Sequence, residues 1–208
     1  MIAIQQHATH PEQRVLLLTD RNTVGPFDAS SLISCGVSVG CEWNPVIAEC
    51  LDEAEQLLIA KRYVMVYLTN SQRTEAEIQR YLIKKGMAKA ICDRTVEWVR
   101  TQGWVNDEEV GLYLIQKAQQ SASKHSKNQM AAKLIKRGIP VRSVEQLLKS
   151  ENYDELPAAR AMAQKKWLEI MRKDREHPRA VLAGYLARKG FATATVKKVL
   201  AEFQHFDE

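Results

Sequence analysis

One heptapeptide pattern occurs three times in the chain: YLIKKGM at residues 81–87, KLIKRGI at 133–139 and YLARKGF at 185–191. The glycines of successive copies, Gly86, Gly138 and Gly190, are 52 residues apart. A fixed period of roughly this size is typical of structural repeats that stack on their neighbours. The pattern therefore predicts three copies of one supersecondary unit.

Each copy carries start and stop signals of a short helix. Thr74, Ser126 and Pro178 stand twelve residues before the three glycines. Thr74 with Glu77 and Ser126 with Gln129 fit the capping box, and proline is equally suited to a first helical turn. A glycine just past the helix adopts the left-handed conformation of a Schellman motif. We therefore predict three helices of about three turns, each closed in this way.

Apolar patterns on both sides extend each copy to three helices. Residues that follow each glycine recur at the same 52-residue period, so that Cys92 aligns with Val144 and Val196. Within each copy, these residues have the spacing of one helix face. Amphipathic segments precede the capped helices at residues 52–69, 107–121 and 154–173. We predict a mainly α protein, with three tandem three-helix repeats over residues 52–104, 105–152 and 153–208 in an elongated, curved array.

The first 51 residues have a different pattern and are predicted to form a small extension that contains β-structure. Residues 15–20 resemble a short strand that ends in a turn, and apolar and other residues alternate over 37–43. The four cysteines, Cys35, Cys41, Cys50 and Cys92, form no C-x-x-C pair, so we predict that they are reduced and mostly structural.

Composition and missing motifs exclude several classes of protein. Of the 208 residues, 45% are hydrophobic, but no apolar run approaches the roughly 20 residues that span a bilayer. The first residues lack the pattern of a signal peptide, so we expect a cytoplasmic protein without membrane association. Phosphate-binding loops, zinc motifs and nucleophile elbows are absent. We therefore expect no enzyme activity, no cofactor and no metal.

Charge is unevenly distributed along the chain. Residues 1–60 carry a net charge of −6, and residues 61–208 carry +11. A basic body of this kind favours an anionic partner such as nucleic acid or a nucleoprotein surface.

The ordered motifs resemble the RecX family of bacterial regulatory proteins, which are built from three-helix repeats. The resemblance is carried by RTExE at residues 73–77, YLxKKG at 81–86, GWVND at 103–107, KLxKRGI at 133–139 and YLARKGF at 185–191. It covers about residues 55–205, and the first residues are similar to the N-terminal extension of some members. The chain departs from the family at Val110 and Gly111, where an aromatic residue and alanine are usual, and at Ser126, where glycine is common.

The resemblance implies a non-enzymatic protein that binds RecA and the filament that RecA forms on single-stranded DNA. It would block filament extension, ATP hydrolysis, strand exchange and cleavage of the SOS repressor. From the residues we expect weak binding to single- or double-stranded DNA at most, and a monomer, because an elongated repeat body with a polar exterior does not require a partner subunit. The candidate contacts to RecA or DNA are basic residues that recur in register or lie near helix starts: Arg73, Lys84, Lys85, Lys124, Lys127, Lys133, Lys136, Arg137, Arg179, Arg188 and Lys189.

Two alternatives remain open from the residues alone. The chain could be a DNA-binding module that acts independently of RecA, because three-helix units with a basic helix can mimic helix-turn-helix domains. The basic residues could also be a solvated face that only aids solubility.

Overall fold

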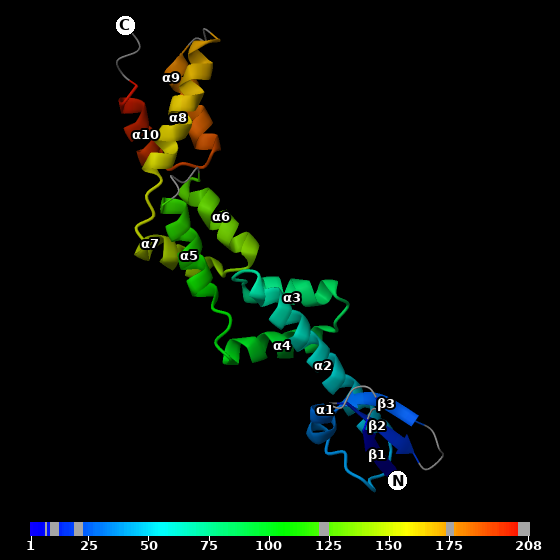
Figure 1. Cartoon of the computed structure of the whole chain (residues 1–208). Coiled ribbons are helices and arrows are strands. Elements are labelled where there is room, and N and C mark those ends of the chain that lie inside the picture. The colour runs from blue at the N-terminus through cyan, green and yellow to red at the C-terminus, as the bar shows by residue number, and fades with distance from the viewer. Residues whose placement is uncertain (7, 9–12, 19–22, 121–124, 174–176, 204–208) are drawn as a thin grey trace. The chain divides into compact units, whose positions relative to one another are not determined.

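The computed structural model describes residues 1–6, 8, 13–18, 23–120, 125–173 and 177–203 (Figure 1). Its elements are β1 (Ile2–Gln6), β2 (Gln13–Leu18), β3 (Thr23–Asp28), α1 (Ala29–Ser34), α2 (Pro45–Thr69), α3 (Glu75–Lys84), α4 (Lys89–Thr101), α5 (Asp107–Gln120), α6 (Lys127–Arg137), α7 (Val141–Ser150), α8 (Leu156–Met171), α9 (Pro178–Arg188) and α10 (Thr193–Ala201). The mainly α class, the helical repeats and the N-terminal β-structure are thus confirmed.

The chain divides into two compact units, which are described separately below. The first contains Met1–Ser71 and Ile78–Trp104, and the second contains Gln72–Glu77 and Val105–Glu208. The first turn of α3 therefore belongs with α5 to α10.

The N-terminal extension is a three-stranded antiparallel sheet in the order β1-β2-β3. Its core consists of Ile2, Leu16, Leu32, Val37 and Leu51. β2 confirms the strand expected near residue 15, whereas β1 and β3 were not predicted. The expected strand over residues 37–43 is absent, because the chain turns at Gly40, where φ is 89°. The backbone of this segment is hydrogen-bonded to β1 at Ile2, through Gly40 and Cys41.

The prediction of four reduced cysteines is wrong for one pair. Cys35, which follows α1, forms a disulfide with Cys50 in α2, with 5.9 Å between their Cα atoms. Cys41 and Cys92 carry free thiols. The pairing depends on α2, which begins at Pro45, seven residues earlier than the amphipathic pattern indicated.

The capped helices end as predicted. Gly86, Gly138 and Gly190 have φ angles of 83°, 108° and 81°. The amide of the residue after each glycine donates to the leucine carbonyl five positions earlier, at 3.1 to 3.3 Å, which is the Schellman bond.

The helix starts follow the prediction as well. Both hydrogen bonds of the capping box are present between Thr74 and Glu77 and between Ser126 and Gln129. In the third repeat Pro178 occupies the first helical position and His177 the N-cap, so the start is shifted by one residue.

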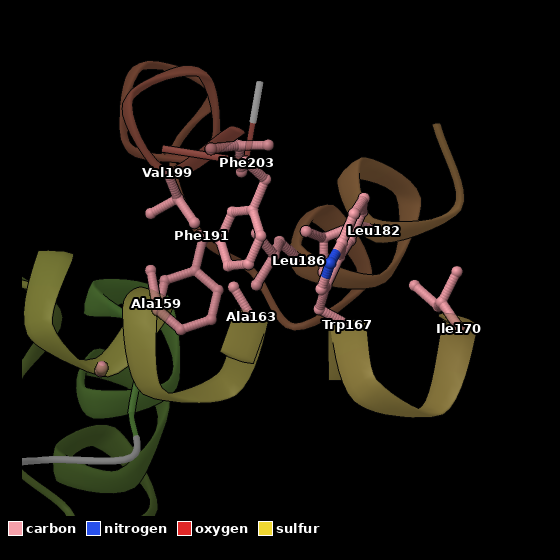
Figure 2. Close-up of a cluster of buried hydrophobic side chains, with 11 residues drawn as sticks. Ala159, Ala163, Trp167, Ile170, Leu182, Leu186, Phe191, Val199 and Phe203 are labelled. Atoms are coloured by element: carbon pink, nitrogen blue, oxygen red, sulfur yellow. The ribbon is translucent and has the colours of Figure 1, made fainter. Parts of the chain in front are cut away.

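The leucines of the capped helices lie in the repeat cores. In the third repeat, Leu182 and Leu186 are fully buried and pack with Trp167, Phe191 and Phe203, whose side chains converge in Figure 2. The rings of Trp167 and Phe203 are 5.1 Å apart. Trp167 is therefore a core residue.

The second repeat accommodates one departure from the family pattern by close packing. Gly111 is buried in α5, and a Cβ atom at this position would lie only 2.6 Å from Cδ1 of Leu147 in α7. The absence of a side chain at Gly111 thus allows α5 to approach Leu147.

Two equivalent junctions join successive capped helices within the second unit. Thr74 Oγ1 donates to the carbonyl of Arg137 at 2.7 Å, and Ser126 Oγ donates to the carbonyl of Lys189 at 2.9 Å. Both pairs are 63 residues apart in sequence. Each N-cap hydroxyl therefore caps its own helix and also satisfies a carbonyl at the end of the next capped helix.

A carboxylate completes each junction. Asp107 accepts a hydrogen bond from the Glu75 amide at 2.9 Å, and Glu155 accepts one from the Lys127 amide at 2.6 Å. Glu155 also accepts from the Ala192 amide at 2.8 Å and is itself buried. Negative charge at a helix N-terminus is stabilising, since the first amides lack partners in the helix.

Candidate functional site

The last turn of each capped helix carries two basic residues, in the same position relative to its glycine. Lys84, Lys85, Lys136, Arg188 and Lys189 are exposed, whereas Arg137 is half-buried. Basic residues are favourable there because the helix C-terminus carries partial negative charge. The repeat thus places cations at the same place on each copy of the unit.

Arg137 differs from the other five because it is held in the first junction. Its guanidinium donates to both carboxylate oxygens of Glu77, at 2.8 and 2.7 Å, and to the carbonyl of Gln72 at 3.0 Å. Bidentate pairs of this kind are strong and geometrically specific. Arg137 therefore has a structural role in this unit, which its position in the sequence motif did not reveal.

The ion pair shifts the acidity of Glu77. Burial acts to raise the pKa of this carboxyl group, but the hydrogen bonds from Arg137 and from the Thr74 amide outweigh burial and hold the pKa below its usual value. Glu77 is therefore charged at neutral pH, and its carboxylate accepts hydrogen bonds from both the Thr74 amide and Arg137.

Two of the lysines lie over tyrosine rings. Lys85 Nζ is 5.2 Å from the ring centre of Tyr63 and 5.6 Å from that of Tyr81. In the third repeat, Lys189 Nζ lies 5.7 Å from the ring of Tyr185. Such distances are those of cation–π contacts. The sequence signal was a tyrosine four residues before a lysine, which our sequence analysis did not use.

The remaining candidates lie in several environments. Lys127 and Lys133 are exposed on α6, whereas Arg73 and Arg179 are half-buried. Lys124 lies outside the described residues. Within the second unit, the structure gathers two of the candidates, Lys133 and Lys136, at one place.

That place is an open groove of about 600 Å³ within the second unit. It is lined by His125, Gln129, Ala132, Lys133, Lys136 and Met162, and we call it the α6–α8 groove. Lys133 and Lys136 were candidates from the sequence, whereas Met162 was not. No local pattern predicts this groove, because α8 and α6 belong to different repeats.

In the part of the chain that the structure describes, no helix combines the length and the apolar character required to cross a membrane.

Comparisons with known proteins agree on one family. Residues 60–98 match the profile described as RecX, first three-helix domain. The regulatory protein RecX of Geobacillus kaustophilus is 27% identical over 179 residues, which are 84% of this chain and 65% of that protein. The regulatory protein RecX of Clostridium beijerinckii is 24% identical over 200 residues, which are 94% of this chain and 92% of that protein.

A solved structure has the same fold. The crystal structure of a regulatory protein RecX superposes with a TM-score of 0.75 and 17% identity, over 96% of this chain and 98% of that chain. The profile match begins in α2 and ends in α4, and the sequence relatives extend the similarity across the repeats. Residues 60–98 thus match the first three-helix domain of RecX, and the chain is similar in sequence to regulatory proteins RecX and shares the fold of a solved one.

Proposed function

We propose that the protein is a cytoplasmic, monomeric regulator that binds RecA and the RecA filament on single-stranded DNA. It inhibits the ATPase, strand-exchange and coprotease activities of RecA, and so modulates recombination, DNA repair and the SOS response. Similarity to proteins named regulatory protein RecX supports a regulatory role. The observation that carries the proposal is the exposed basic pair that recurs at the same place on the first and third capped helices, with Lys136 exposed on the second.

Repetition of a contact suits a polymeric partner. A filament presents the same surface at regular intervals, so several modest contacts from one chain add up to tight binding. Exposed lysine and arginine side chains also favour a partner with negative potential, such as a protein filament that carries nucleic acid.

The test is the rate of ATP hydrolysis by RecA on single-stranded DNA, titrated with this protein at two salt concentrations. We expect inhibition at protein concentrations below that of RecA, together with weak binding to the same DNA alone. Reversing two repeated charges, Lys136→Glu with Arg188→Glu, is expected to weaken inhibition at least about tenfold, a change of about 1.4 kcal/mol.

The matched control reverses two exposed lysines that lie outside the repeated positions, Lys149→Glu with Lys197→Glu. This variant has the same net charge as the first one, so a general electrostatic effect would lower inhibition equally in both. Equal inhibition by the wild type and by the Lys136 and Arg188 variant, with unchanged helicity, would contradict the assignment of the contact residues.

The second candidate function is DNA binding that is independent of RecA. The lysine–tyrosine contacts at Tyr81 and Tyr185 favour it, because aromatic rings and cations together bind single-stranded nucleic acid. Tight binding to bare DNA, with inhibition of RecA only by competition for that DNA, would establish this alternative.

A further inference from the structure

The α6–α8 groove combines an apolar surface with cations from a single helix. Gln129, Ala132, Lys133 and Lys136 follow one another at helical spacing along α6. Met130 and Leu134 of the same helix are fully buried and lie on its core side. The groove is therefore lined by the face of α6 that is left outside its core, with Met162 of α8 beside it.

Its apolar surface comes from Ala132, from Met162 and from the aliphatic stems of the two lysines. Met162 is half-buried and packs against the core of the third repeat, so its backbone is held while its thioether adapts to a ligand. A volume of about 600 Å³ falls in the range of pockets that accept small ligands or a few side chains. One or two apolar side chains of a partner would fit there.

The charge of α6 is positive throughout its length. Its eleven residues, KNQMAAKLIKR, contain four basic side chains and no acidic one. Arg137 is paired with Glu77, and Lys133 and Lys136 are exposed beside the groove. A ligand with carboxylates next to an apolar side chain would complement both features.

We propose that the α6–α8 groove binds an acidic peptide segment through one or two apolar side chains, with carboxylates of the segment paired to Lys133 and Lys136. The inference concerns this groove alone and does not depend on RecA being the partner.

Nucleic acid fits the groove less well than such a peptide. Among the described residues that line it, the imidazole of His125 is the only ring, so successive bases would find no row of rings on which to stack. A phosphodiester backbone has the negative charge but no apolar group to cover Ala132 and Met162. The apolar surface therefore favours a peptide over a single strand.

The first probe is a fluorescein-labelled synthetic peptide, Gly-Asp-Glu-Leu-Leu-Asp-Glu-Gly, whose binding to the full chain is followed by fluorescence anisotropy. We expect saturable binding that weakens with salt. A second peptide with serine in place of both leucines has the same charge, and it should bind at least about tenfold more weakly. Labelled oligothymidylate of eight nucleotides tests the nucleic-acid alternative in the same assay.

The variants Ala132→Glu and Lys133→Gln test the location. Both positions are exposed on α6 and both new residues form helix readily, so the fold is retained. Ala132→Glu should weaken binding of the leucine-containing peptide at least about tenfold. Lys149→Gln, on α7 and outside the groove, is the matched control for Lys133→Gln and should leave binding unchanged.

A second readout places the peptide on the molecule. Methyl resonances of the six methionines can be followed in carbon-labelled protein. The peptide should shift the Met162 resonance and leave that of Met171, which does not line the groove, unchanged.

Each of three results would overturn the proposal: no saturable binding up to about 1 mM peptide, equal binding of the serine peptide, or tighter binding of oligothymidylate that is sensitive to Ala132→Glu. The assay contains neither RecA nor its filament. Failure here therefore leaves the proposed regulation of RecA untouched, and failure of the ATPase test leaves this result untouched.

Discussion

Replacing the hydroxyl of Ser126 separates two functions that this one side chain combines. Ser126 Oγ accepts from the Gln129 amide, as an N-cap does, and donates to the Lys189 carbonyl at 2.9 Å. Its side chain is completely buried. Aspartate is as good an N-cap as serine, but its carboxylate has no hydrogen to donate. Ser126→Asp would therefore keep the cap and place a buried negative charge against a carbonyl oxygen.

The two substitutions have different expected magnitudes. Ser126→Ala removes the cap, worth about 1 kcal/mol, and leaves a carbonyl without its donor, at about 1–3 kcal/mol. We expect a loss of about 2–4 kcal/mol in the free energy of unfolding, measured with urea by circular dichroism. Ser126→Asp should lose at least as much, since burial of an unpaired charge adds to the cost.

The control is an N-cap that has only the local function. Asn44 caps α2 through the Ile47 amide at 3.0 Å and is exposed. Asn44→Asp should change stability by less than about 0.5 kcal/mol. If Ser126→Asp proved as stable as the wild type, the hydroxyl would act only as a cap, and the reasoning about the junction would be refuted.

Four further substitutions test other parts of the fold by urea unfolding. Glu77→Gln should lower stability at pH 7 by about 1–3 kcal/mol, because a charged hydrogen bond to Arg137 is lost. Because the pKa of Glu77 is lowered from its usual value, its stabilisation is present above the unfolded pKa and is lost as the pH falls through the folded pKa. The stabilities of the wild type and of the Glu77→Gln variant should therefore converge in acid, and a difference that stays constant down to about pH 2 would contradict this. Gly190→Ala should lower the free energy of unfolding more than Gly86→Ala, although both glycines have positive φ. Of the two positions, only Gly190 would place a Cβ near another residue, Ser126 Oγ at 3.2 Å. Equal losses of stability in the two variants would argue against this close approach. Leu186→Ala should cost about 2–5 kcal/mol, and a loss below 1 kcal/mol would mean that this leucine is not in the core.

The capped helices could be predicted because their signals are local and occur three times. A capping box and a glycine four residues after a leucine involve only neighbours in the chain, so tertiary packing does not override them. The start of α2 was missed although its signal was present. Asn44 followed by Pro45 is a good N-cap and first residue, but the alternating pattern before it favoured a strand.

The sheet and the groove depended on contacts between distant segments. β1 pairs with β2 through residues such as Ile4 and Leu16, and nothing within β1 alone specified that partner. The basic positions at the helix ends were visible from the sequence, but Arg137 could not be distinguished from its neighbour Lys136. Only the packing of the first turn of α3 places Glu77 beside Arg137.

The carboxylate of the second junction differs from that of the first, so the repeats are not interchangeable. Glu155 spans two amides, those of Lys127 and Ala192, and the residue 52 positions before Ala192 is Pro140, which has no amide hydrogen. The first junction uses the shorter Asp107. In a chimera whose third repeat is a copy of the second, a proline would stand in place of Ala192 and an aspartate in place of Glu155. The carboxylate would then be shorter, and one of the two amides that it binds would be missing. The hydrogen bond from Lys127 to Glu155 thus distinguishes the junction of the second and third repeats from that of the first and second, and shuffled arrays are expected to pair less well than the native one.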